Sequence, residues 1–142
     1  MATRIPDDGD IVRALGFVAM YSSWLEQDVD DVLDVLGEER NGWLRWPVSR
    51  KVKEALRRAR GIGNESSKRL EQALLHAESL FERRNELVHG RIFAEHERDF
   101  LKSGRQSVPT REVTFGELQD LANSLFDARG ELLRVSLFGL SS

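Results

Sequence analysis

The sequence DIVRALGFVAMYSSWLEQDVDDVLDVL, residues 10–36, decides the fold class. Its apolar side chains recur at gaps that alternate between four and three residues, which is the spacing of one face of an α-helix. Ser22 occupies the one missing position on this face. Asp10, or one of the two aspartates before it, can cap the helix, and Gly37 ends it. The apolar face consists of Ile11, Leu15, Val18, Leu25, Val29, Val32 and Leu36.

A second, shorter helix is predicted over residues 49–60, with the glycine-containing GIGN sequence ending it. One side of this helix carries a basic stripe at gaps of three, four and three, formed by Arg50, Lys53, Arg57 and Arg60. Such a stripe is a candidate for binding the phosphates of RNA. The loop before it contains Trp43, Leu44 and Trp46, which we expect to fold onto the core rather than to stack on a base.

The third main helix follows a cap at Ser66 or Ser67. Its apolar seam runs through Leu70, Leu74, Ala77 and Phe81. Continued at the same spacing, the seam reaches Arg84 and then Val88. Arg84 is therefore predicted on the buried side of the helix, where a guanidinium needs a partner or an anion.

Residues 91–113 are irregular, and their RIF and REV sequences predict a small hairpin. The sequence TFGE then predicts a capping box in which Thr114 bonds toward Glu117 and opens the last helix. Its core side is predicted to hold Leu118, Leu121, Leu125, Leu132 and Leu133. The sum is one all-α domain over residues 1–142: a bundle of four main helices with an irregular or hairpin excursion before the last one.

Composition excludes several classes of protein and site. The chain has no cysteine, which excludes disulfides, thiolate metal sites and cysteine nucleophiles. The N-terminal residues do not resemble a signal peptide, and no segment has the apolar length of a membrane span, so we expect a cytoplasmic protein. No glycine-rich phosphate loop and no histidine pair with zinc spacing occur, so neither a cofactor nor a metal is expected.

Charge is distributed unevenly along the chain although the net charge is only −3. Residues 1–40 carry ten acidic and three basic residues, a net of −7, whereas residues 41–69 carry nine basic and two acidic ones, a net of +7. The net charge argues against a protein that coats nucleic acid by bulk charge. The asymmetry leaves two interpretations open: the first two helices pair with each other or face solvent, or the basic segment binds an anion.

The sequence RNELVHG, residues 84–90, resembles the RNA-cleaving motif of the HEPN (higher eukaryotes and prokaryotes nucleotide-binding) family. The shared features are an arginine followed by asparagine, a histidine five positions after the arginine, and a glycine directly after the histidine. The bare arginine-to-histidine spacing also fits Arg69–His76, Arg83–His89 and Arg91–His96. Only Arg84–His89 combines a predicted buried arginine, an adjacent asparagine and the end of a helix.

The resemblance implies a small all-α domain that cleaves RNA without a metal, as a homodimer, in a toxin or defence effector with an antitoxin or regulatory protein as a further partner. An imidazole exchanges protons near neutral pH, which suits His89, and Arg84 offers a permanent forked donor for phosphate charge. Asn85 would orient the histidine or bond a phosphate oxygen, and Glu86 would pair with Arg83 or Arg84.

Arg84 and His89 differ by about 140° around a regular helix. The site therefore needs a distorted helix end or a second subunit. The alternatives are a non-catalytic member of the same fold that binds RNA, nucleotide or a protein partner, and a purely structural dimerisation module. If the two residues form no site, His89 would interact favourably with the helix dipole and Arg84 would cap the last carbonyl groups of the helix. Phe17, Met20 and Trp24 are expected to make core or dimer contacts.

Overall fold

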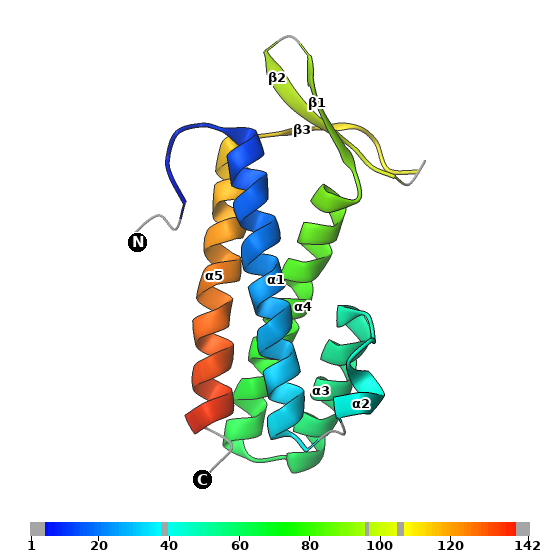
Figure 1. Ribbon diagram of the computed structural model, residues 1–142, viewed down its shortest axis with the longest axis vertical. Helices are drawn as coiled ribbons and strands as arrows, with labels where there is room; N and C mark the ends of the chain where they lie inside the picture. The colour runs from blue at the N-terminus through cyan, green and yellow to red at the C-terminus, as the bar shows by residue number, and fades with distance from the viewer. Residues whose placement is uncertain (1–4, 38–39, 96, 105–106, 139–142) are drawn as a thin grey trace.

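The computed structural model describes residues 5–37, 40–95, 97–104 and 107–138. Helices form an elongated bundle, and a small sheet lies at one of its ends (Figure 1). The helices are α1 (Ile11–Val35), α3 (Val48–Ile62), α4 (Glu65–Val88) and α5 (Phe115–Phe138), and the single turn α2 (Arg40–Trp43) precedes α3. The predicted bundle of four main helices is therefore confirmed.

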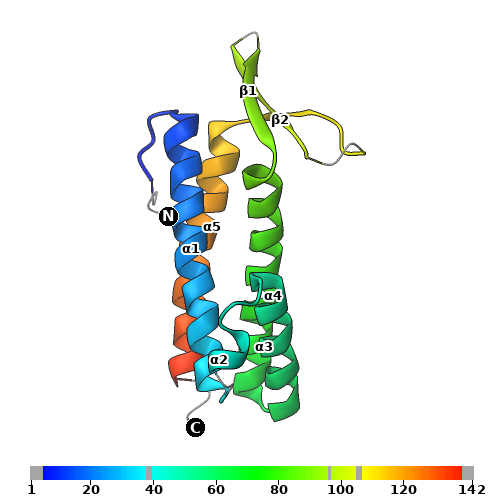
Figure 2. The ribbon, with the colours of Figure 1, turned by 45° about the vertical axis from the view of Figure 1, so that its right-hand side comes forward.

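The order of the helices places the end of α4 and the start of α5 at the sheet. Helices α1 and α5 lie side by side and run away from the sheet, whereas α4 runs toward it (Figure 1). Helix α3 covers only the half of α4 that is remote from the sheet (Figure 2). The sheet-proximal half of α4 is thus left without a covering helix on that side.

The helix starts follow from side-chain caps. The Asp10 carboxylate accepts from the backbone N–H of Arg13 at 3.0 Å, as the sequence predicted for α1. For α4 the predicted serine cap is wrong, because Asn64 is the N-cap residue. Its side-chain oxygen accepts from the N–H of Ser67 at 2.8 Å, while the Ser67 hydroxyl accepts from the N–H of Asn64 at 3.0 Å. Both orphan donors are satisfied, which a cap at Ser67 alone would not achieve.

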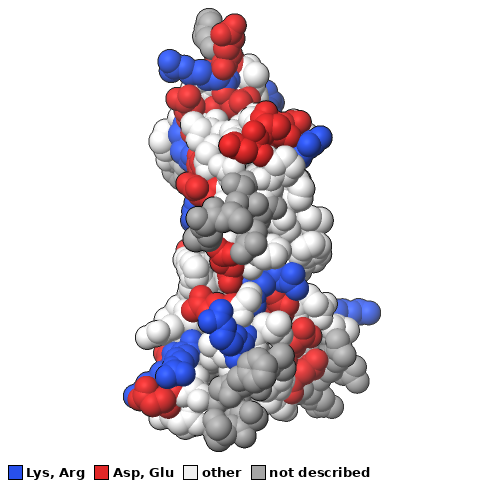
Figure 3. Space-filling view, turned by 90° about the vertical axis from the view of Figure 1, so that its left-hand side faces the viewer, with Lys and Arg blue, Asp and Glu red and all other residues white. Residues whose placement is uncertain are grey.

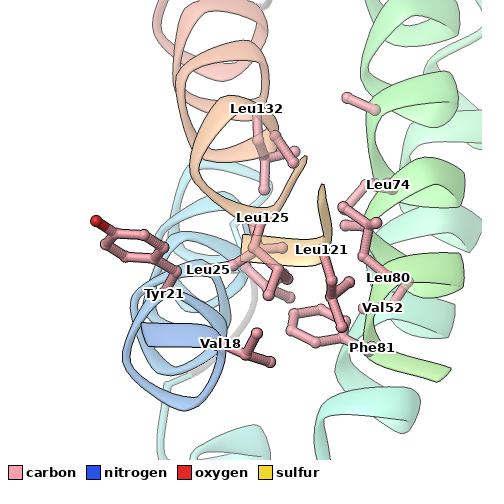
Figure 4. Packing of buried hydrophobic residues seen from close by; sticks show 14 of the residues in the cluster. Val18, Tyr21, Leu25, Val52, Leu74, Leu80, Phe81, Leu121, Leu125 and Leu132 are labelled. Atoms are coloured by element: carbon pink, nitrogen blue, oxygen red, sulfur yellow. The ribbon is translucent and has the colours of Figure 1, made fainter. Parts of the chain in front are cut away.

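The core lies where α1, α4 and α5 face one another. Leu121 of α5 lies beside Phe81 of α4, and Leu125 of α5 lies beside Leu25 of α1 (Figure 4). Leu133 was predicted on the same side and is instead 48% exposed, whereas Leu132 is fully buried. Neighbouring residues of a helix lie about 100° apart, so only one of the two leucines can face the core.

Two further apolar predictions divide in the same way. Trp43, the last residue of α2, is buried, as expected, but Leu44, which follows the helix, is about half exposed. Near the end of α4 the buried position belongs to Leu87, and the predicted seam residue Val88 is exposed.

The segment before α5 is a three-stranded antiparallel sheet. Its strands are β1 (Arg91–Glu95), β2 (Arg98–Lys102) and β3 (Arg111–Val113), in the order β1-β2-β3. The predicted strands RIF and REV exist, but their direct pairing is wrong: both pair with β2, which lies between them. The hairpin that forms is β1–β2, and it extends past the helices (Figure 1).

Strand β3 is tied to the start of α5. The Thr114 hydroxyl accepts from the N–H of Glu117 at 3.1 Å, which confirms the Thr114 half of the predicted capping box. The Glu117 carboxylate binds the Arg111 guanidinium at 2.8 Å. Hydrogen bonding to Glu117, and then to Glu86, raises the pKa of Arg111, so this arginine stays cationic. Arg111 thus joins β3, α4 and α5.

The surface mixes charges of both signs. On the side that carries α5, basic and acidic side chains are interspersed with uncharged ones (Figure 3). Helices α1 and α3 are joined by an ion pair between Asp30 and Lys51 at 2.8 Å, and both side chains are largely buried. Part of the charge asymmetry of the sequence is therefore used inside the fold. No helix in the described ranges is long and apolar enough to cross a membrane.

Candidate functional site

Arg84 lies on the buried side of α4, as predicted, and its guanidinium points toward α1. Its side chain is only 16% exposed. Nη1 donates to the Ser22 hydroxyl and to the Glu26 carboxylate, each at 2.8 Å. Nε and Nη2 both donate to the Asn85 side-chain oxygen, at 3.0 and 2.7 Å. The forked geometry of arginine serves three partners at once, and the buried charge is compensated by Glu26.

Two irregularities of the sequence therefore meet in space. Ser22 interrupts the apolar face of α1, Arg84 interrupts the apolar seam of α4, and the two side chains bond to each other. Sequence reasoning missed the third member, Glu26. The sequence feature that could have identified Glu26 is its position one helical turn after Ser22, on the same side of α1.

His89 caps the C-terminus of α4 and is exposed. Its backbone N–H still donates to the Asn85 carbonyl at 3.0 Å, so α4 keeps regular geometry to its end. Arg84 and His89 consequently diverge, as the spacing predicted. Arg84 and His89 could form one site either through a distorted helix end or through a second subunit. The regular end of α4 excludes the first of these within the chain.

His89 opens into a cleft of about 820 Å³ between the end of α4 and the segment after β2. We call it the His89 cleft. Its lining residues are Glu82, Asn85, Glu86, His89, Gly90, Ser103, Gly104 and Val108. Arg84 is not among the described residues that line it. Asn85 is, so the residue that Arg84 holds is also a wall of the cleft.

The orientation of the Asn85 amide follows from these contacts. Because its oxygen accepts two hydrogen bonds from Arg84, its NH₂ group is the end left to donate. A phosphate oxygen in the His89 cleft would be a suitable acceptor. Arg84 is therefore linked to the wall of the cleft through Asn85 within one chain.

Two glycines bring the sheet close to His89. A Cβ atom on Gly90 would lie 2.5 Å from a Leu101 methyl group, 2.9 Å from the Glu86 carbonyl oxygen and 3.0 Å from the Lys102 carbonyl oxygen. A Cβ atom on Gly104 would lie 3.3 Å from the carbonyl oxygen of His89. Close backbone approach thus explains the glycine that follows the histidine in the motif.

Glu86 does not make the predicted contact with Arg83 or Arg84. Its carboxylate pairs instead with Arg111 of β3, at 3.1 Å. That partner comes from 25 residues further along the chain and brings the sheet to the wall of the cleft. Among the described residues, Glu82 is the other carboxylate that lines the cleft besides Glu86.

The basic stripe of α3 is largely engaged with other side chains. Arg57 pairs with Glu54, and Arg60 pairs with Glu71 of α4 at 2.6 Å. The guanidinium carbon of Arg50 lies 3.9 Å from the centre of the Trp46 ring. Lys53 is exposed. The stripe also lies on the helix remote from the sheet, so it is not brought together with His89 (Figure 2).

The other arginine–histidine pairs gain no support from the structure. His76 lies on an exposed face of α4 with Glu131 3.8 Å away, and Arg69 is exposed near the start of that helix. His96 lies outside the described residues. Groups of acidic and histidine side chains suited to a metal ion are absent from the described ranges.

In comparisons with protein-family models, curated proteins and solved structures, the chain matches none.

Proposed function

We propose that the chain is a metal-independent endoribonuclease of the HEPN type that works in the cytoplasm as a homodimer. The observation that supports this proposal is the connection Arg84–Asn85–His89. Asn85 bonds to Arg84 and lines the same cleft as His89. The three residues of the motif are thereby one unit at the end of α4.

The unit contains a proton-exchanging group and a hydrogen-bond donor for the phosphate, and both can take part in metal-independent cleavage. The ribose 2′-oxygen attacks the adjacent phosphorus and loses its proton, and the bond from phosphorus to the 5′-oxygen breaks as that oxygen gains a proton. The products are a 2′,3′-cyclic phosphate and a 5′-hydroxyl. His89 exchanges one of the two protons, solvent water exchanges the other, and the Asn85 NH₂ group donates to a phosphate oxygen. Arg84 is the positioning residue that fixes the Asn85 amide.

The charge of the cleft is the reason for a second chain. Glu82 and Glu86 line it, and the C-terminus of a helix carries partial negative charge. A phosphate therefore needs cations from beyond this wall.

The surface of α1 suits a dimer, because no charged residue occurs from Ala14 to Leu25 and both Met20 and Trp24 are more than one-third exposed. Phe17 instead packs against the core.

A second candidate is a non-catalytic module of the same fold that binds RNA, nucleotide or a protein partner. The observation in its favour is that Ser22, Glu26 and Asn85 already accept hydrogen bonds from all three nitrogens of the Arg84 guanidinium. Its guanidinium is then a structural link between α1 and α4 rather than part of a reaction. Such a module would still present the cleft, with Asn85 and His89, to a ligand.

Cleavage of total RNA in the presence of a chelator separates the two candidates. We expect the natural chain to cleave and His89→Ala to be inactive. His76→Ala, which removes an exposed histidine from the same helix, is the matched control and should stay active. Equal activity of the natural chain and His89→Ala, or no activity in either, would contradict the nuclease proposal. RNA binding without cleavage would favour the second candidate.

The positioning role of Arg84 has a separate readout. Because Arg84 acts through Asn85, Arg84→Ala and Asn85→Ala should each lower kcat, and the double variant should be no slower than the slower single one. Losses of activity that multiply would show that Arg84 acts independently of Asn85. If the chain is a toxin, expression of the natural chain without an antitoxin should stop growth, whereas expression of His89→Ala should be tolerated.

A further inference from the structure

The small sheet has one face on the bundle and one face turned away from it. Leu101 and Val113 are each only 2% exposed, and Ile92 packs against the core. Successive side chains of a strand point to opposite faces, so the residues between these three face outward. The β1–β2 hairpin extends beyond the helices, which leaves this outward surface uncovered by them (Figure 1).

We call that surface the outer sheet face. It is built from three cross-strand pairs, Arg91–Lys102, Phe93–Phe100 and Glu95–Arg98. The two phenylalanine rings stack at 5.8 Å between centroids, with 24° between their planes. Both are half-buried, yet neither belongs to the core or to the apolar residues packed against it. The stacked pair is therefore not explained by the packing of the bundle.

Cations surround this aromatic pair. Arg91, Arg98 and Lys102 are all exposed. Within the described ranges no ion pair or side-chain hydrogen bond joins these three residues to another group. This contrasts with Arg57, Arg60 and Arg84, whose guanidinium groups are engaged. Glu95 and Glu112 also lie on this face, so its three basic side chains outnumber its acidic ones by one.

The outer sheet face begins at the His89 cleft. Arg91 follows Gly90 and Lys102 precedes Ser103, and both of those neighbours line the cleft. The first cross-strand pair of the outer face is thus basic and adjoins the candidate site. At about 3.3 Å per residue of strand, the phenylalanine pair lies only about 7 Å further along the hairpin.

We propose that the outer sheet face binds single-stranded RNA and directs it into the His89 cleft. One base stacks on the Phe93–Phe100 pair, while Arg91, Lys102 and Arg98 contact the backbone phosphates. The inference rests on the nuclease function proposed above and names the form of its substrate. It also places cations next to the acidic wall of the cleft, in addition to those that a second chain would bring.

The geometry favours a single strand over a duplex. Bases stack about 3.4 Å apart, so a base between two rings needs roughly 6.8 Å between them. The rings are closer than that, and a base can only lie on their outward surface. The faces of bases are accessible in single strands and hidden in duplexes, and base–aromatic stacking with a basic groove is typical of single-strand binding.

The test is binding of a short, unstructured, fluorescent RNA to the His89→Ala chain, followed by anisotropy. Phe93→Leu with Phe100→Leu keeps apolar volume on the strands but removes the aromatic surface. We expect binding to weaken by roughly 5- to 150-fold, the range for removal of one stacked base. Lys68→Gln removes an exposed cation from the opposite end of α4 and should leave binding unchanged.

A second variant does not depend on the aromatic pair or on its contribution to folding. Arg91→Gln with Lys102→Gln keeps both phenylalanines. The slope of log affinity against log salt should fall by about 0.7 for each phosphate that the variant no longer neutralises, or roughly 1.4 in all. Circular dichroism of each variant reports whether the fold is retained.

The outcomes separate this inference from the proposed function. Unchanged affinity and salt slope in both variants would overturn the inference and leave the outer sheet face to a protein partner. Weakened binding in both variants supports it, even if the natural chain cleaves no RNA and the nuclease proposal fails. Cleavage by the natural chain together with unaffected binding in the variants would leave the nuclease proposal standing and this inference overturned.

Discussion

Replacing Gly90 by alanine tests how tightly the end of α4 is joined to the sheet. The added Cβ would lie within about 3 Å of two backbone oxygens, those of Glu86 in α4 and Lys102 in β2. It cannot move away from both, so strand β2 must separate from the helix. The Leu101 methyl group, at 2.5 Å, belongs to a side chain that is itself buried in the core.

The expected destabilisation follows from two opposing contributions. Overpacking of this kind costs about 1–3 kcal/mol. Alanine also restricts the unfolded chain, which stabilises by about 0.4–1 kcal/mol. The net effect is destabilisation by about 1.5 kcal/mol, and the melting temperature should fall by roughly 6 °C for a domain of this size.

Gly130→Ala is the matched control. Gly130 is exposed inside α5, and a Cβ atom there would meet nothing within 4 Å. The same substitution should therefore stabilise by about 0.5–1 kcal/mol, because alanine favours a helix interior over glycine. Urea and thermal unfolding followed by circular dichroism measure both variants. A Gly90→Ala chain as stable as the natural one, or shifted in the same direction as Gly130→Ala, would refute the close approach.

Three further predictions concern buried charge and assembly. Lys51→Met should lower the free energy of unfolding in urea by about 3 kcal/mol, because it leaves the Asp30 carboxylate buried without its cation. Adding Asp30→Leu should recover most of that stability, and equal destabilisation of the single and double variants would contradict this. Burial raises the pKa of Asp28 above its ordinary 3.8, and its hydrogen bond to Arg129 offsets only part of this. The folded chain therefore holds the Asp28 proton more tightly than the unfolded chain does. The stability of the natural chain relative to Asp28→Asn should be highest below pH 3.8 and should decline as the pH rises through the higher folded pKa. A stability difference that does not change with pH would contradict the assignment. Sedimentation should give a mass of twice 16.2 kDa for the natural chain, and Met20→Glu, which places a charge on the exposed uncharged face of α1, should shift it toward the monomer; a natural chain that is already monomeric would refute the dimer.

The sequence predicted the bundle because helix periodicity is a local property. The four-and-three spacing placed α1 and α4 correctly, and it marked Ser22 and Arg84 as polar residues on buried faces. These two polar positions on apolar faces were informative, because the side chains of Ser22 and Arg84 bond to each other. The same rule could not choose between neighbouring leucines, as Leu133 shows, because both satisfy a coarse apolar pattern.

What sequence reasoning missed depends on partners that are far apart in the chain. Strand β2 is five residues long and begins and ends with a basic residue, so its pattern carried little signal, and only pairing on both edges makes it a strand. Glu86 was expected to pair within its own helix, but Arg111 reaches it from β3. The link from Arg84 to the cleft through the Asn85 amide likewise depends on where α1 places Glu26.

The chemical identity of the RNA ends made by the protein tests the central claim most directly. A single-stranded RNA is incubated with the natural chain in excess chelator, and the products are analysed by mass spectrometry. Attack by the ribose 2′-oxygen, with proton transfer at His89, predicts 2′,3′-cyclic phosphate and 5′-hydroxyl ends that are absent with His89→Ala. Ends bearing a 3′-hydroxyl and a 5′-phosphate, or cyclic ends formed equally by His89→Ala, would contradict it.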